Sequence, residues 1–320
     1  MSRLPATWLP FADATAAPLT YLSGRFLRLV RNRGIQNMPK SRSALMRAGV
    51  YPVLDQYYEP MFDSRHLTHP LSDPRALPGI DWNIAGQLAL LDEFDYNHEF
   101  ADIPNDKPRE LTFYLENGAF EGGDAELWYN LIRLKKPRRI MEIGSGNSTL
   151  MALKAVHQNT QDDPQYSCQI TCVEPYEQSW LERTGVSVVR RRVEELGVDF
   201  FAALQSNDIL FIDSSHVIRP QGDVLFEYLQ LLPTLNPGVI VHIHDIFSPR
   251  DYPTDWVVDQ VRMWNEQYLL EAFLTHNSEW KVLAAVNHLS QDHRDALAAK
   301  SPLLSDTASP GSFYIQRNSP

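Results

Sequence analysis

The stretch that decides the fold is "RRIMEIGSGNST", which runs from Arg138 to Thr149. It begins as a short apolar run, as a buried strand does, and then turns at two glycines before a helix that we expect to start near Ser148. Gly144 and Gly146 permit a tight turn and let the backbone approach a ligand closely. The first turn of the following helix offers free N–H groups. The stretch therefore predicts a strand, a ligand-binding turn and a helix in succession.

The alternation of strand and helix continues along the chain from Pro137. Further strands are predicted at "CQITCVEP", "VSVVR", "DILFID" and "GVIVHIHD", and the helical stretches are 148–157, 177–183, 198–205 and 221–232. Strands that alternate with helices indicate βαβ units and a parallel sheet. After a long predicted helix at 256–274, "WKVLAAV" and "SFYIQR" are separated by a polar interruption without a clear crossover helix. We expect these two strands to form an antiparallel pair at the edge of the sheet.

The glycine turn alone does not identify a ligand. A dinucleotide fingerprint needs a third glycine where this chain has Thr149, and no lysine follows that would cradle phosphates. Three acids stand at strand ends: Glu142 before the first glycine, Glu174 after the second strand and Asp213 after the fourth. Because ligands of open α/β sheets bind at the carboxyl ends of the strands, we expect these acids to converge. Such an acidic pocket suits a cationic nucleoside better than a pyrophosphate.

This combination resembles the class I S-adenosylmethionine-dependent methyltransferases. The matching stretches are "MEIGSGNST", "VEP", "LFIDSSH" and the closing pair of strands, over about Pro137 to Arg317. The resemblance implies an α/β fold with a Rossmann-like sheet of order 3-2-1-4-5-7-6, the last strand antiparallel, and S-adenosyl-L-methionine as cofactor. It places Glu142 and the two glycines near the methionine part, Glu174 at the ribose, and "RVEEL" near the adenine. The implied cofactor-binding residues are Glu142, Gly144, Ser145, Gly146, Asn147, Glu174, Val193, Glu194 and Asp213.

Within that family the closer likeness is to small-molecule O-methyltransferases, including the catechol and macrolide-sugar types. These enzymes often bind a divalent metal through acids after strands four and five, which makes Asp213 and Asp245 the metal candidates here. His244 stands where the sugar enzymes have an acid, and Ile246 where the catechol type has an amide. Mg²⁺ prefers several hard oxygen ligands, whereas carboxylates with imidazoles suit Zn²⁺, Mn²⁺ or Fe²⁺ better. The sequence leaves the presence and the identity of the metal open.

The same cluster also suits acid–base chemistry. Methyl transfer from a sulfonium is an in-line displacement, for which the protein must orient the acceptor and remove its hydroxyl proton. Histidine is the usual base near neutral pH, so the catalytic candidates are His216, three residues past Asp213, and His244 with the adjacent Asp245. Alternation along the fifth strand puts His242 and His244 on one face and Asp245 on the other. His242 lies deeper in the strand, and we interpret it as a core histidine.

The charge of the chain is unevenly distributed. The formal net charge of −11 argues against a general nucleic-acid binder. Residues 1–50 hold eight Arg or Lys against one acid, which leaves about −18 for the remainder. This basic arm is a candidate for contact with an anionic surface, RNA or an acidic partner, although a solvated or self-packing arm explains the same charges. The sequence does not determine the oligomeric state, and a homo-oligomer is compatible with it.

Nothing in the composition indicates a membrane-spanning protein. No run of eighteen apolar residues occurs, and the N-terminus lacks the positive-then-apolar pattern of a signal peptide. The two cysteines, Cys168 and Cys172, lie on one predicted strand and would point to the same face, which suits free thiols better than a disulfide. We therefore expect a reducing, cytoplasmic location.

Two regions are predicted from the change in pattern along the chain. Residues 1–110 are rich in Pro, Asp and aromatic residues and are interpreted as an irregular N-terminal arm and cap segment, with a helix around Asn83–Phe94. Residues 111–320 are interpreted as the methyltransferase domain, which begins near a helix at Gly123–Leu134.

The leading functional hypothesis is S-adenosylmethionine-dependent methylation, by a His/Asp base or with metal assistance, of a small hydroxylated acceptor such as a sugar or a natural product. One alternative is an NAD-dependent oxidoreductase on a doubly wound sheet, which Thr149 and the terminal antiparallel pair disfavour. Another is a non-catalytic, methyltransferase-like binding protein, which the retained Glu142, Gly144, Gly146 and Glu174 argue against. The acceptor itself cannot be named from the sequence, and N-methylation is not excluded.

Overall fold

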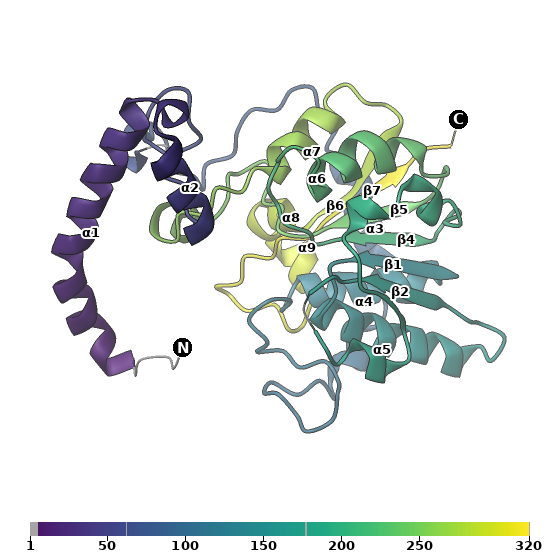
Figure 1. Ribbon diagram of the computed structural model, residues 1–320. Coiled ribbons are helices and arrows are strands. Elements are labelled where there is room, and N and C mark those ends of the chain that lie inside the picture. Colours follow the sequence, from purple (N-terminus) through teal and green to yellow (C-terminus); the bar gives the residue numbers. More distant parts are fainter. Residues whose placement is uncertain (1–5, 62, 177, 320) are drawn as a thin grey trace. The chain divides into compact units, whose positions relative to one another are not determined.

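The computed structural model describes residues 6–61, 63–176 and 178–319. The chain divides into two compact units, Met1–Thr68 and His69–Pro320 (Figure 1). This boundary lies earlier than residue 110, where the composition had suggested one. The segment after residue 68 belongs with the sheet because buried polar groups tie it there. The side chain of Gln87 accepts a hydrogen bond of 2.7 Å from the backbone N–H of Ala285, and that of Asn83 donates one of 2.9 Å to the carbonyl of Val282.

The first unit is more helical than we expected. It contains α1 (Leu9–Asn32) and α2 (Pro39–Ala48), where the sequence had been interpreted as an irregular arm. Prolines suggested that irregularity, but Pro10 and Pro39 stand in the first turns of the two helices, where no N–H is needed, and Pro18 stands inside α1 without ending it. The remaining residues are largely Ala, Leu and Arg, which are strong helix formers.

The second unit contains a seven-stranded sheet in the order β3-β2-β1-β4-β5-β7-β6, as the resemblance implied. β7 is antiparallel to both of its neighbours, β5 and β6, and the other pairs are parallel. The strands are β1 (Arg139–Ile143), β2 (Gln169–Val173), β3 (Ser187–Val189), β4 (Ile209–Ile212), β5 (Ile240–Ile243), β6 (Trp280–Ala285) and β7 (Phe313–Arg317).

Alternate residues of each strand face two separate apolar layers. One layer joins the sheet to α3, α4, α5, α8 and α9, and the other joins it to α6, α7 and the turn between α6 and β5. Within β4, for example, Ile209 and Phe211 face the first layer and Leu210 and Ile212 the second. The helices are α3 (Ile84–Asp92), α4 (Asp124–Lys135), α5 (Asn147–Asp162), α6 (Asp223–Phe226), α7 (Glu266–Leu274), α8 (Val286–Asp292) and α9 (Arg294–Ala298).

Several predicted helices are shorter or broken. The expected helix at 256–274 is a single π-type turn at Asp255–Asp259, an irregular stretch and then α7. The stretches expected to be helical at 177–183 and 198–205 hold short 3₁₀ turns at Leu181–Thr184 and Val198–Phe201, and residue 177 lies outside the described residues. Conversely, the polar interruption before β7 contains α8 and α9, each of which buries a leucine.

Candidate functional site

The glycine turn after β1 joins the ends of three strands. The backbone N–H of Gly144 donates to the carbonyl of Val173 at 3.0 Å, and that of Asp213 donates to the carbonyl of Ile143 at 2.8 Å. Gly144 has a φ of +77°, and a Cβ atom there would collide with the carbonyl oxygen of Asp213. Only glycine permits this conformation together with this close approach. The turn therefore sets the distance between the first and fourth strands at their carboxyl ends.

A cavity of about 660 Å³ opens at this turn. Its wall includes eight of the nine predicted cofactor-binding residues: Gly144, Ser145, Gly146, Asn147, Glu174, Val193, Glu194 and Asp213. The volume lies within the range of small-molecule sites. Glu174 spans two loops, because one carboxylate oxygen accepts from the N–H of Ser145 at 3.3 Å and the other from the N–H of Tyr176 at 3.0 Å.

Glu142, the ninth residue, lies behind the wall of the cavity. Its side chain is fully buried and accepts hydrogen bonds from the hydroxyl of Thr149 and, at 3.5 Å, from the thiol of Cys172. Thr149 in turn accepts from the N–H of Gly146 at 3.2 Å. Burial raises the pKa of Glu142 to about 7. In this position Glu142 supports the glycine turn through Thr149.

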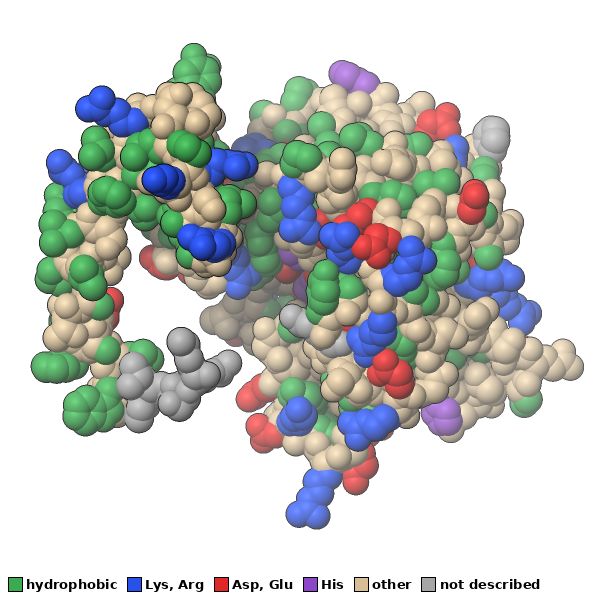
Figure 2. Space-filling view, viewed as in Figure 1, with side chains coloured by type: hydrophobic (Ala, Val, Ile, Leu, Met, Phe, Trp, Pro, Cys, Tyr) green, Lys and Arg blue, Asp and Glu red, His purple; other side chains and the backbone are tan. Residues whose placement is uncertain are grey.

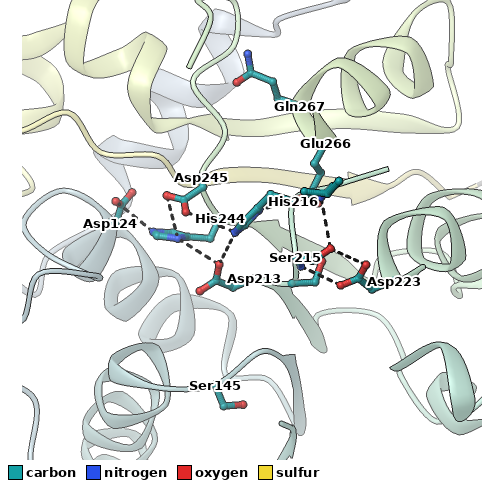
Figure 3. A network of polar contacts seen from close by, with 12 residues as sticks. Asp124, Ser145, Asp213, Ser215, His216, Asp223, His244, Asp245, Glu266 and Gln267 are labelled. Carbon is teal, nitrogen blue, oxygen red and sulfur yellow. Dashed lines mark hydrogen bonds and ion pairs between the residues drawn. The ribbon is translucent and has the colours of Figure 1, made fainter. Parts of the chain in front are cut away.

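Two histidines and two aspartates gather at the ends of β4 and β5 (Figure 3). Nε2 of His216 lies 3.2 Å from a carboxylate oxygen of Asp213 and 3.5 Å from one of Asp245. Nδ1 of His244 lies 3.5 Å from Asp245 and 3.8 Å from Asp213. Asp213 also lines the cavity, so it links the cluster to the glycine turn.

The prediction that His244 and Asp245 point to opposite faces is wrong. β5 ends at Ile243, before either residue, and Asp245 has a φ of +59°. Strand alternation applies only while the backbone stays extended. The left-handed turn at Asp245 brings its carboxylate back beside the imidazole of His244 (Figure 3).

Two further carboxylates, which the sequence did not predict, belong to the cluster. Oε2 of Glu266, at the start of α7, lies 2.8 Å from Nδ1 of His216, and Oε1 accepts a hydrogen bond of 3.0 Å from the hydroxyl of Tyr228. Asp124, at the start of α4, lies 3.5 Å from Nε2 of His244. Acids at helix starts are ordinary because they favour the helix dipole. Neither residue therefore carries a local sequence signal for this role.

The charges of the cluster hold protons on both imidazoles. Burial alone would lower the pKa of His216, but Asp213 and Glu266 outweigh it and raise that pKa well above its usual value. Burial likewise opposes the charge on His244, and Asp245, Asp124 and Asp213 raise its pKa. Burial opposes the ionised form of Asp213, yet the two imidazoles hold the pKa of this carboxyl below its usual value.

His242 is a core residue, as expected from its depth in the strand. Its Nε2 lies 2.8 Å from the hydroxyl of Ser312, and its ring stacks on Tyr314 with the centroids 4.1 Å apart. Burial lowers the pKa of this imidazole well below its usual value, so it stays neutral.

The same cluster offers donors for a cation. Among the described residues, one donor atom each from Asp213, His216 and Asp245 lie within 4.8 Å of one another. Both ring nitrogens of His244 are buried and lack a hydrogen-bond partner. Two carboxylates with imidazoles fit Mn²⁺, Fe²⁺ or Zn²⁺ better than Mg²⁺. Asp213 and Asp245 were the predicted metal ligands, and His216 is added by the structure.

The strand order of the sheet and the position of the cavity are those that the resemblance to methyltransferases implied. Residues 141–246 match the family model described as a methyltransferase domain. Within that range the chain is therefore similar to a methyltransferase domain. The matched region of the domain runs from β1 through β5 and contains the glycine turn, Glu174, Asp213 and the histidine cluster.

The chain is also similar to a protein compared by sequence and to solved structures. An uncharacterized protein of Archaeoglobus fulgidus is 31% identical over 138 residues, which are 41% of this chain and 61% of that protein. The chain therefore matches about three fifths of that relative's length. An O-methyltransferase from Bacillus cereus in complex with SAH is 14% identical, over 72% of this chain and 91% of that one, with a TM-score of 0.37. The MycE methyltransferase from the mycinamycin biosynthetic pathway, in complex with Mg and SAH, is 15% identical, over 60% of this chain and 49% of that one, with a TM-score of 0.33.

Proposed function

We propose that this chain uses S-adenosylmethionine to methylate a hydroxyl oxygen of a small molecule. The observation that carries the proposal is the continuity between two features: a cavity at the glycine turn, and a buried histidine–carboxylate cluster that shares Asp213 with it. The first is where a class I sheet binds its ligand, and the second can remove a proton.

The cavity wall supplies the groups that a charged nucleoside needs. In this proposal Glu174 at the end of β2 accepts hydrogen bonds from the ribose hydroxyls, and Val193 and Glu194 contact the adenine; all three residues line the cavity. Gly144 and Gly146 admit the methionine part close to the backbone, and Ser145, Asn147 and Asp213 complete this wall. When bound, S-adenosylmethionine would supply the methyl group: the acceptor oxygen forms a bond to the methyl carbon in line as the carbon–sulfur bond breaks, and S-adenosylhomocysteine is the leaving group.

The chain's own part in the reaction is to orient the acceptor and take its proton. We assign the proton to Nε2 of His216, because Glu266 already occupies Nδ1 of that ring at 2.8 Å. A base must first be neutral, so this role requires loss of the proton that Asp213 and Glu266 favour on the imidazole. His244 and Asp245 flank the same space and are the alternative catalytic pair.

A divalent cation is a second candidate for activating the hydroxyl. Asp213, His216 and Asp245 would hold it, since their donor atoms lie within 4.8 Å of one another. A bound cation would lower the pKa of a coordinated hydroxyl as a Lewis acid. A chelator distinguishes the two mechanisms: activity that survives it and does not rise with added Mn²⁺ or Zn²⁺ supports the imidazole base.

The test of the function is a screen of hydroxylated acceptors, sugars and natural products among them, with radiolabelled S-adenosylmethionine. Calorimetric titration with S-adenosylmethionine and with NAD accompanies it. Binding of NAD alone would instead support the oxidoreductase. Binding of S-adenosylmethionine without transfer to any acceptor, amines included, would favour a binding protein.

The cellular setting stays a prediction. No helix in the described part of the chain is long and apolar enough to cross a membrane. Cys168 and Cys172 are free thiols, which supports the expected cytoplasmic location. A homo-oligomer also remains a prediction.

A further inference from the structure

The N-terminal unit contains a long helix with an uncovered apolar face. In α1, the side chains of Phe11, Leu19, Leu22, Phe26 and Leu29 are between 52% and 69% exposed. Apart from the first interval, their spacings are three and four residues, so they form one stripe along the helix. Figure 2 shows hydrophobic side chains along this helix. In α1 the one buried side chain is Val30.

The other side of the same helix is cationic. Arg25, Arg28 and Arg31 follow one another at intervals of three residues, and α2 adds Lys40, Arg42 and Arg47. All of these except Arg31, which pairs with Glu59, are exposed. Between residues 6 and 50 the one acidic residue is Asp13. The two helices therefore combine a broad apolar stripe with a strong positive charge.

This combination fits a helix that lies on a membrane rather than one that crosses it. An interfacial helix has aromatic and leucine side chains on one face, Lys and Arg on the other, and low overall hydrophobicity. α1 has these features, and no described helix is apolar enough to span a bilayer. Its basic residues would interact with the anionic headgroups near the membrane surface.

We propose that the N-terminal unit binds the surface of an anionic membrane, with the apolar stripe of α1 inserted at the level of the headgroups. The rest of the chain, residues 69–320, carries a formal charge of −16 and would be repelled by such a surface, so attachment occurs through this unit alone. Pairing of two copies through the same stripe is less favourable, because it would bring two arginine-rich helices together. The proposal does not depend on the catalytic role of the chain.

The experiment is co-sedimentation of the full chain with extruded vesicles. One set is phosphatidylcholine alone, and the other is phosphatidylcholine mixed with phosphatidylglycerol. We expect binding to the mixed vesicles only, weakened by added salt because headgroup charges are screened. Circular dichroism of the free and bound protein checks that the helix is retained.

Two variants separate the contributions of charge and apolar surface. Arg25→Glu with Arg28→Glu should weaken binding to the mixed vesicles at least about tenfold. Leu22→Gln with Phe26→Gln keeps residues compatible with a helix and should also weaken binding. The matched control is Arg109→Glu with Arg183→Glu, which changes the net charge equally at exposed positions of the second unit and should bind as the parent does.

Four results would overturn the proposal. The first is absence of sedimentation with the mixed vesicles. The second is equal loss of binding in the control, which would show that net charge alone matters. The third is a dimer, seen by analytical ultracentrifugation without lipid and abolished by the Leu22 and Phe26 changes, which would assign the stripe to a second copy. The fourth is displacement of the protein from the vesicles by RNA that binds α1, with no change in RNA binding when Leu22 and Phe26 are replaced. This result would assign the positive charges to nucleic-acid binding.

Discussion

At the scale of single residues, two glycines allow the effect of a left-handed backbone conformation to be distinguished from the effect of a close atomic contact. Gly144 and Gly185 both have positive φ, +77° and +84°. A Cβ atom at position 144 would collide with Asp213, whereas one at position 185 would meet nothing within 4 Å. An alanine would be strained by the positive φ at both positions, but only at position 144 would it also collide with Asp213.

Gly144→Ala should abolish binding of S-adenosylmethionine, because the collision with Asp213 displaces the end of β4 from the cavity. Gly185→Ala should cost about 1 kcal/mol of stability from left-handed strain alone and leave the affinity unchanged. Calorimetric titration and urea unfolding of both variants measure the two effects. Equal affinities in the two variants would show that the cavity does not depend on this contact.

The buried carboxyl of Glu142 makes stability depend on pH in a defined direction. Its pKa rises from 4.5 to about 7 on folding, so the folded state binds the extra proton between these values. The free energy of unfolding that this group contributes therefore falls as pH rises through that window, by about 3 kcal/mol in total. Glu142→Gln keeps an acceptor for Thr149 and should remove this slope.

Urea unfolding at several pH values between 4 and 8 measures the effect. The stability difference between variant and parent should shift in favour of Glu142→Gln as pH rises. Glu110→Gln, a change of the same chemistry at an exposed position, is the control and should leave the parent's pH dependence in place. A difference between Glu142→Gln and the parent that stays constant over this range would contradict the assignment.

At the scale of elements, the start of α7 determines how His216 is used. The helix begins at Glu266, which holds Nδ1 of His216, while the preceding Trp264 stacks on the same ring with the centroids 4.2 Å apart. A carboxylate at Nδ1 keeps the proton there and leaves Nε2 to accept another. In the proposed reaction Glu266 therefore acts through His216, as a positioning residue.

Glu266→Gln should lower kcat by about 10² to 10⁴, since the amide can donate to Nδ1 and favour the wrong tautomer. The KM for S-adenosylmethionine should change little, because Glu266 does not line the cavity. Tyr228→Phe removes the hydrogen bond to the other oxygen of Glu266 and should have a much smaller effect. Steady-state kinetics of both variants test this, and a loss in Glu266→Gln confined to KM would reject the role.

The elements also show what the sequence could predict. The strands and their order follow from short apolar runs that end in Gly or an acid, because burial on both faces leaves a continuous apolar signal. The cofactor loop has a local motif. Glu266 and Asp124 have no such motif. Each reaches the site from a helix that lies 50 or more residues along the chain from the histidine it contacts. The break before α7 was not predicted, and there Trp264 stacks on His216 while Trp256 packs on Phe247 and Trp264.

At the scale of the whole molecule, the second unit extends further toward the N-terminus than composition suggested. Residues 69–110 carry buried Leu90, Leu91, Phe94 and Phe100, which belong to the same apolar layer as α4 and α5. They lie in a stretch rich in Pro and Asp, which hides the apolar positions from a reading of composition. The first unit, by contrast, has its own helices and a charge of the opposite sign.

The boundary between the units can be tested with two fragments. Residues 69–320 should unfold cooperatively and bind S-adenosylmethionine as the full chain does, because every residue of the cavity wall and of the apolar layers is retained. Residues 111–320 should not fold, because this fragment lacks the large buried side chains of residues 69–110. Each such side chain contributes about 2 kcal/mol through its burial, and their sum approaches the free energy of unfolding of a whole domain. Circular dichroism on heating and calorimetric titration compare the two. A folded, cofactor-binding fragment 111–320 would place the boundary near residue 110 and leave the earlier segment as an accessory cap.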